Sequence, residues 1–92
     1  MNVVITQAKV VGTYSVELTF VDGTRKRVNL EGWLYGEMFE RLRDPLYFAQ
    51  MRLEPGDITI TWPNGADFAP EFLYELEPES VQPELSLEFQ TR

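Results

Sequence analysis

The sequence of 92 residues contains no cysteine and no histidine. The absence of cysteine excludes disulfides and thiolate–metal sites. The absence of histidine removes the side chain that most often acts as a general base near neutral pH, and also the commonest transition-metal ligand. We therefore expect a protein that is not an enzyme and that holds no metal ion or other cofactor.

Long apolar runs and phosphate-binding glycine motifs are also missing. No segment approaches the ~18 apolar residues that a bilayer-spanning helix needs, and the first residues lack the pattern of a signal peptide. The six glycines stand apart, so neither GxxxxGKS/T nor GxGxxG occurs. These absences predict a soluble, cytoplasmic protein without a membrane partner.

Basic residues are scarce in the second half of the chain. Residues 1–53 carry seven basic and six acidic side chains, whereas residues 54–92 carry one basic and nine acidic ones. The net charge of −7 repels phosphate backbones, so nucleic acid is not an expected partner. A partner protein with a basic surface suits this charge, and solubility alone explains it equally well.

The composition, 43% apolar and 13% aromatic, is typical of a folded protein, and the length predicts one domain. We expect an α+β fold over residues 1–78, with an antiparallel three-stranded meander, short helices, a second β-hairpin and a short C-terminal helix. Residues 79–92 form an acidic tail. Alternation of Leu85, Leu87 and Phe89 with polar residues makes an extra strand possible there.

The meander runs from Val3 to Leu30, and its last hairpin has two possible registers. A two-residue loop at Asp22 and Gly23 would place arginines on the apolar face. A three-residue loop that begins at Val21, with Gly23 left-handed in a bulge, avoids this and is the register we predict. It sets these pairs: Phe20–Thr24, Leu18–Lys26, Glu17–Arg27 and Val16–Val28.

A helical period follows the meander. Between Glu31 and Asp44 apolar residues recur every four positions, which predicts a helix that Gly36 would divide into two short pieces. The residues of this period are Leu34, Met38 and Leu42. Pro45 ends the helix, and a further helical turn is expected over residues 46–49.

A second hairpin is predicted from residues 51–54 and 57–62. Pro55 and Gly56 suit the central positions of a type II turn. The register then pairs Leu53 with Ile58 and Met51 with Ile60, all facing inward together with Trp62. After this hairpin, a short helix is expected from Pro70 to about Leu76.

Two runs of residues carry a resemblance to a known family. They are Phe39-Glu40-x-Leu42-Arg43-Asp44-Pro45-x-Tyr47-Phe48 and Trp62-Pro63-Asn64-Gly65-Ala66-Asp67-x-x-Pro70-x-Phe72-Leu73-Tyr74-Glu75, and the hairpin run Leu18-Thr19-Phe20-x-Asp22-Gly23 fits as well. Over residues 8–76 the chain resembles a small bacterial family known as domain of unknown function 2442.

The resemblance implies an antitoxin-like binding role, because members of this family are often encoded beside small candidate toxins. Some members carry an additional C-terminal helix-turn-helix that would bind DNA. Only 15 residues follow Glu77 in this sequence, too few for such a domain. We therefore do not expect DNA binding to be inherited from the family.

The run from Trp62 to Asp67 is the most concentrated candidate for an interaction surface. In the functional interpretation, Asn64 and Asp67 offer hydrogen bonds beside the aromatic edges of Trp62 and Phe68. In the structural interpretation, which turn chemistry favours, Trp62 is buried, Asn64 and Gly65 turn the chain, and Asp67 bonds backbone amides near the next helix.

The C-terminal helix supplies further candidates for an interaction surface: Glu71, Tyr74 and Glu75. Glu71 and Glu75 share one helix face, and their spacing matches no calcium-binding loop. A solvated acidic face, or a landing site for a basic partner, explains them better than metal binding or acid–base catalysis.

The leading hypothesis is a non-catalytic interaction module that binds a small basic protein, such as a toxin encoded by a neighbouring gene. A homodimer formed by strand exchange is a further possibility. The alternative is a regulator that binds a small ligand or nucleic acid through the Trp62–Asp67 corner, Arg25 and Arg27. Alternation places Lys26 on the opposite face of the strand from these two arginines, which weakens the nucleic-acid version.

Overall fold

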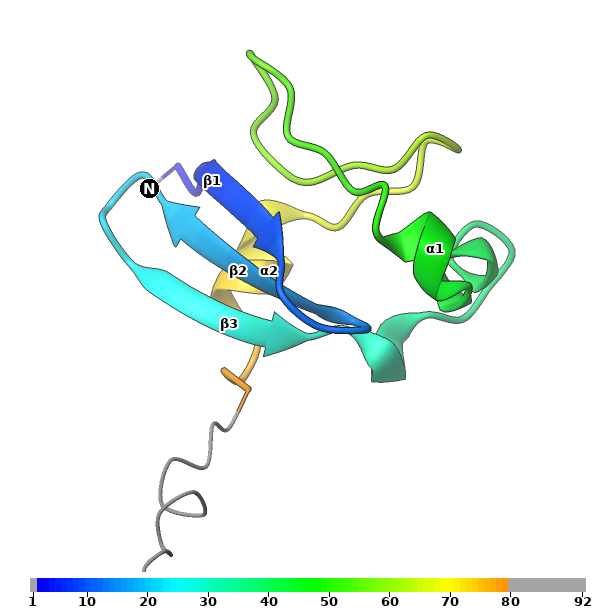
Figure 1. Ribbon diagram of the computed structural model, residues 1–92. Helices are drawn as coiled ribbons and strands as arrows, with labels where there is room; N and C mark the ends of the chain where they lie inside the picture. The colour runs from blue at the N-terminus through cyan, green and yellow to red at the C-terminus, as the bar shows by residue number, and fades with distance from the viewer. Residues whose placement is uncertain (1, 80–92) are drawn as a thin grey trace, which may run out of the picture.

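Three strands form the regular part of the computed structural model, which describes residues 2–79 (Figure 1). They are β1 (Ile5–Val10), β2 (Ser15–Phe20) and β3 (Arg25–Asn29), joined in one antiparallel sheet in the order β1-β2-β3. Short helices and 3-10 turns follow the sheet in the chain. The predicted α+β class and the three-stranded meander are therefore confirmed.

The β2–β3 hairpin has the register that the bulged loop predicts. Val16 lies opposite Val28. Gly23 has a φ of 93° and donates its N–H to the Phe20 carbonyl at 2.8 Å. A positive φ of this size is easily adopted only by glycine, so the turn and the register depend on the same residue.

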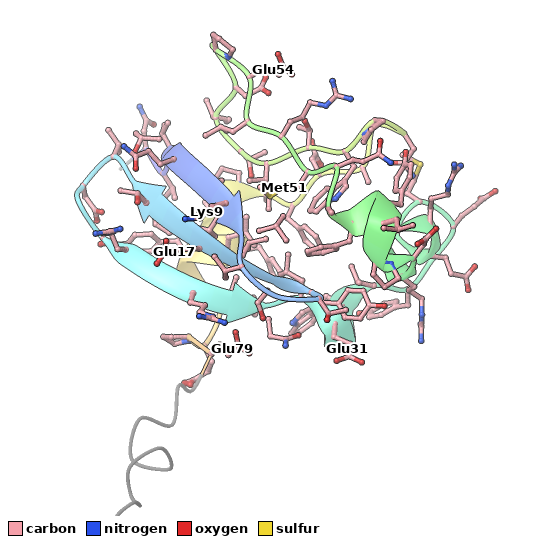
Figure 2. All side chains as sticks on the ribbon, viewed as in Figure 1. Lys9, Glu17, Glu31, Met51, Glu54 and Glu79 are labelled. Atoms are coloured by element: carbon pink, nitrogen blue, oxygen red, sulfur yellow. The ribbon has the colours of Figure 1, made fainter. Side chains whose placement is uncertain are left out.

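The two faces of the sheet differ as the alternation predicts. The inward apolar side chains of the hairpin are all buried: Val16, Leu18, Phe20 and Val28. On the open face, Lys9 of β1 lies opposite Glu17 of β2 (Figure 2). The alternation of side chains along each strand, with a period of two residues, therefore decides which face of the sheet packs against the rest of the protein.

The α-helix predicted between Glu31 and Asp44 is wrong. The structure has two 3-10 turns there, η1 (Glu31–Trp33) and η2 (Glu40–Arg43). Gly36 lies between them with a φ of 90° and divides the segment, as predicted. The left-handed backbone at Gly36 ends any helix that approaches it, so neither piece grows into an α-helix.

The period of four in this segment was nevertheless a good guide to packing. Leu34 and Leu42 are fully buried. Met38, midway between them, is exposed because the chain turns at Gly36 instead of continuing on one helical face. The pattern identified the inward leucines, and the backbone that presents them is irregular.

Both predicted short helices are present. α1 (Pro45–Phe48) is capped by Asp44, whose carboxylate accepts the Leu46 N–H at 3.0 Å. α2 (Pro70–Glu75) packs against the sheet through the edge-to-face contact of the Tyr74 ring with Phe20, at 4.9 Å between centroids. The Phe20–Tyr74 contact joins α2 to the buried face of β2.

The C-terminal end of α2 is bound by a lysine of β3. Lys26 Nζ donates to the carbonyls of Tyr74 and Leu76, each at 2.6 Å. The last carbonyls of a helix have no partner inside the helix, so a positively charged donor stabilises them. Lys26 therefore extends inward among apolar neighbours to serve the end of α2.

The second hairpin is formed only in outline. Residues 51–62 double back, and Gly56 has the positive φ, 94°, that the predicted turn requires. The backbone is paired at one bridge, Arg52 with Thr61, which is two residues away from the predicted register. Two more residues therefore enter the loop, and Ile58, predicted to face inward, is 53% exposed.

Tertiary hydrogen bonds explain this larger loop. The Ile58 carbonyl accepts the Ile5 N–H at 2.9 Å, and the buried Thr59 hydroxyl donates to the Phe68 carbonyl at 2.6 Å. The first bond ties the loop to β1, and the second ties it to the segment before α2. Local turn preferences contain neither bond, so they predicted the shorter loop.

Residues 62–67 form a corner in which Trp62 is buried and Asn64 turns the chain, as the structural interpretation of the sequence predicts. Trp62 is 2% exposed, and its ring N–H donates to the Phe48 carbonyl at 2.9 Å. Asn64 Oδ1 accepts the Ala66 N–H at 3.0 Å, which closes the turn. Trp62 and Asn64 therefore serve the fold through bonds within the chain.

The chain leaves α2 around the edge of β3. The Glu79 N–H donates to the Arg27 carbonyl at 2.6 Å, and the Glu79 carboxylate accepts the Ser15 hydroxyl at 2.7 Å. Glu79, the first residue of the predicted tail, is thus bound to the sheet. The strand predicted around Leu85–Phe89 lies outside the described residues.

Candidate functional site

A shallow groove of about 400 Å³ opens beside α2. Five of its seven lining residues are aromatic: Trp33, Tyr35, Phe39, Phe68 and Phe72, joined by Asp67 and Ala69. The rings come from three segments, namely η1 with the turn after it, the corner before α2, and α2 itself. We call this feature the aromatic groove.

The packing of the rings with one another holds the aromatic groove in shape. Phe68 lies at the centre, 4.8 Å from Phe39 and 5.7 Å from Phe72 between ring centroids. Trp33 meets Phe72 edge-to-face at 5.1 Å. Contacts of this kind contribute about 0.5–1.5 kcal/mol each beyond burial, so the rings are held in place before any ligand arrives.

The floor and the rim of the aromatic groove differ in exposure. Phe68 is 7% exposed and forms the floor, whereas Trp33 is 40% and Tyr35 is 63% exposed. Large aromatic side chains that are gathered in one place and open to water are typical of contact surfaces. The rim therefore has the chemistry of a binding site.

The floor of the aromatic groove continues into the core. Phe68 contacts Trp62 at 5.9 Å, Trp62 contacts Phe48 at 5.4 Å, and Phe48 contacts Tyr14 at 5.5 Å between centroids. The Tyr14 hydroxyl in turn donates to the carbonyl of Arg43. One connected series of rings thus links the surface to the buried centre of the protein.

Asp67 is the single charged residue in the lining of the aromatic groove. It is exposed, and its backbone pairs with Thr61 at an isolated bridge. The predicted bond from its carboxylate to amides near the next helix is absent from the hydrogen bonds of residues 2–79, and Ala69, the residue that precedes α2, has no side chain that could cap the helix. Among residues 2–79 no ion pair engages this carboxylate either, so Asp67 lines the groove with a carboxylate that has no partner in this range.

Some of the candidates between Trp62 and Phe68 support the fold, and others line the groove. Trp62 lies beneath the groove, and the Asn64 side-chain amide donates to the Met38 carbonyl at 3.0 Å in addition to closing its own turn. That bond joins the corner to the segment that carries Trp33 and Tyr35. Of the four corner candidates, Asp67 and Phe68 therefore line the groove and the other two support it.

Tyr74 of α2 belongs to the sheet contact and not to the groove. Its hydroxyl donates to Asp22 Oδ2 at 2.6 Å, and this bond, assisted by the Thr24 amide, lowers the pKa of Asp22. Glu71 and Glu75 are exposed on α2, and within the described part of the chain neither forms an ion pair. They form an acidic face adjoining the groove residue Phe72.

The two arginines of the nucleic-acid hypothesis do not form a free basic pair. Arg25 is exposed, but Arg27 Nε lies 3.2 Å from Glu79 Oε1. The pKa of Glu79 is lowered by the Ser15 hydroxyl above all, and burial partly opposes this effect. Burial lowers the pKa of Lys26, partly offset by Glu77. These shifted groups serve the edge of the sheet and the end of α2.

Sequence reasoning missed most of the aromatic groove. Trp33, Tyr35 and Phe39 lie in the segment that was predicted to be a helix, and neither they nor Phe72 were named as candidates for the site. A usable signal was present, because three aromatic residues within seven positions around a glycine exceed what the buried face of a short helix accommodates. Their convergence with Phe68 depends on the corner, which lies about thirty residues further along the chain.

Between residues 2 and 79, acidic side chains nowhere gather in a group of three that would hold a metal ion. In the same part of the chain, no helix has both the length and the apolar character needed to cross a bilayer.

The fold and the aromatic groove together define a small α+β domain with an open aromatic surface. The family model described as Protein of unknown function (DUF2442) matches residues 5–79, and the chain belongs to this family. The predicted membership of this family is thereby confirmed. No curated protein and no solved structure matches the chain.

Proposed function

We propose that this domain is a non-catalytic binding module that captures a small basic partner protein, in the manner of an antitoxin. The observation that carries the proposal is the exposure of Trp33 and Tyr35 on the rim of the aromatic groove. Tryptophan and tyrosine are the residues most often found as energetic anchors of protein interfaces. A preformed groove also lowers the entropic cost of binding.

The charge of the chain supports a basic partner. The net charge is −7, and the exposed acids closest in sequence to the groove residues include Glu31, Glu37, Asp67 and Glu71. An acidic surface attracts a basic protein over long range and raises its association rate. The aromatic rim then supplies the short-range contacts that determine how long the complex lasts.

Co-expression with the product of the adjacent gene tests the proposal. We expect the two proteins to co-elute in size-exclusion chromatography and the domain to relieve any toxicity of its partner. The variant Trp33→Ala should weaken the complex by about tenfold or more, a typical loss for an interface anchor. Leu46→Ala is the matched control, because Leu46 is 79% exposed and lies outside the groove. Separate elution without relief of toxicity would refute the antitoxin version.

A regulator that binds a small ligand is the second candidate function. The groove volume of about 400 Å³ favours it, since ligand pockets commonly measure roughly 300–1,000 Å³. A thermal-shift screen against a metabolite library would detect such a ligand. Stabilisation that is present in the unmodified protein and absent from Trp33→Ala would support this candidate over a protein partner.

A further inference from the structure

The chemistry of the aromatic groove selects for positive charge. Its lining contains five aromatic rings and one carboxylate, and none of its seven residues is basic. The faces of aromatic rings attract cations, and Trp33 offers the most favourable ring of all for this interaction. A site of this composition repels carboxylates and phosphates and accepts ammonium or guanidinium groups.

Asp67 adds direction to this preference. Its carboxylate has no hydrogen-bond or ion-pair partner among residues 2–79, so both oxygens remain available to a ligand. A carboxylate with two free oxygens can accept two parallel N–H bonds from one guanidinium group. Such a paired bond is shorter and stronger than a neutral hydrogen bond, and it fixes the orientation of the ligand.

Guanidinium fits this site better than ammonium. Its planar group stacks on aromatic faces, is more weakly hydrated than ammonium, and presents donors in a fork that matches a carboxylate. The protein already contains one such contact, because Arg41 Cζ lies 4.4 Å from the centroid of the Tyr47 ring. The aromatic groove repeats this chemistry with more rings and with a carboxylate that the described part of the chain leaves unpaired.

We propose that the aromatic groove is an arginine-binding site, which takes the guanidinium group of an arginine on the partner polypeptide between its rings and Asp67. The inference rests on the proposed function and makes it more specific, since it names the residue by which a basic partner is held. The partner's arginine is flanked by apolar side chains that cover Trp33 and Tyr35. Net charges of opposite sign favour this occupant over a second copy of the acidic chain.

A pair of peptides tests the inference without knowledge of the partner. The probes are acetyl-Ala-Leu-Arg-Leu-Ala-amide and the same peptide with citrulline in place of arginine, which keeps the shape and removes the charge. Binding to the full chain is followed by amide and indole chemical shifts in NMR titrations. We expect saturable shifts at Trp33, Asp67 and Phe72, and an affinity about tenfold lower for the citrulline peptide.

Two substitutions with matched controls separate the contributions. Asp67→Asn removes the charge and nearly preserves the shape, and it should weaken arginine-peptide binding about fivefold or more while leaving citrulline-peptide binding almost unchanged. Glu54→Gln removes the same charge from the 53–57 turn, which does not line the groove and lies far from Glu31 of η1, the turn that carries Trp33 (Figure 2). It should leave both affinities unchanged. Trp33→Ala should weaken both peptides.

Several outcomes would overturn the inference. They are equal affinity for the two peptides, shifts that map away from the groove, no saturable binding at millimolar peptide, or equal effects of Asp67→Asn and Glu54→Gln. Self-association that Asp67→Asn abolishes would show that a second copy occupies the groove, and would also overturn it. A partner complex that is weakened by Trp33→Ala but not by Asp67→Asn removes this inference and keeps the proposed function, whereas peptide binding without any partner complex does the reverse.

Discussion

The sheet (residues 5–30) and the aromatic lobe (residues 31–69) bury similar side chains by different means. In the sheet, a ladder of backbone hydrogen bonds positions the side chains, and the register follows from one turn. In the aromatic lobe, side chains bond the backbone of distant segments, as Trp62 does with Phe48 and Thr59 does with Phe68. The lobe therefore depends on a few contacts between separate segments, and it carries every residue of the aromatic groove except Phe72 of α2.

The largest expected effect distinguishes the two tryptophans of the lobe. Trp62→Ala should lower the free energy of unfolding by about 3–5 kcal/mol, because it opens a cavity at the centre of the ring series and removes the buried indole hydrogen bond to the Phe48 carbonyl, which keeps the Met51 N–H as a donor. Trp33→Ala, at the exposed end of the same series, should cost less than about 1 kcal/mol. Urea denaturation monitored by circular dichroism measures both. Equal losses would contradict the division between a structural core and an exposed rim.

A second change tests how the sheet and α2 hold one another. Lys26→Met should cost about 1–3 kcal/mol, because the carbonyls of Tyr74 and Leu76 lose a charged donor in a partly buried place. Arg25→Met on the same strand is the control, since Arg25 is exposed, and it should change stability by less than about 0.5 kcal/mol. The comparison is made in the same urea assay. A Lys26 variant as stable as the control would remove this link between β3 and α2.

A third change tests the turn that determines the sheet register. Gly23→Ala should cost about 1–2 kcal/mol, since alanine resists the left-handed conformation that Gly23 adopts with a φ of 93°. Gly32→Ala is matched to it, because both glycines have open space around the added methyl group and only Gly23 has a positive φ. The Gly32 variant should be neutral or up to about 1 kcal/mol more stable. Equal effects on the melting temperature would contradict the conformational argument.

The smallest expected effect concerns the edge of β3 and depends on pH. The pKa of Glu79 is below its ordinary value of 4.5, chiefly because of the Ser15 hydroxyl. Just below pH 4.5 the unfolded chain therefore binds more protons at this site than the folded protein. The stabilisation is complete above that pH and is lost as the pH falls through the folded pKa.

Glu79→Gln is the variant that isolates this term. Its unfolding free energy should fall less steeply with decreasing pH than that of the unmodified protein. Urea denaturation at a series of pH values provides the slopes. Parallel curves for Glu79→Gln and the unmodified protein would show that the contact with Ser15 does not favour the ionised carboxylate.

The same comparison shows how far sequence reasoning reached. In the sheet, the alternation of Val16, Leu18 and Phe20 predicted the buried face, and Gly23 predicted the bulged register. Both inferences used residues that are close together in the chain. In the aromatic lobe, the period of Leu34 and Leu42 identified buried residues, but the helix assigned to them was wrong.

The candidate site was predicted only in part. Asp67 and Phe68 were named, and both line the aromatic groove. Trp33 and Tyr35 were not named, because their exposure depends on the turn at Gly36 and on the bond between Asn64 and Met38. Ile58 was placed inside for the corresponding reason, since the bond of its carbonyl to Ile5 is a contact between distant segments.

The sequence by itself determined the α+β class, the hairpin register and the buried face of the sheet, because each follows from side-chain alternation and from glycines that accept a positive φ. The tertiary structure alone decided that rings from three separate segments meet beside Asp67, whose carboxylate has no partner among residues 2–79. The physical reason is that the ring contacts and side-chain-to-backbone bonds of the lobe join residues far apart in the chain. Their geometry exists only after the whole domain has packed.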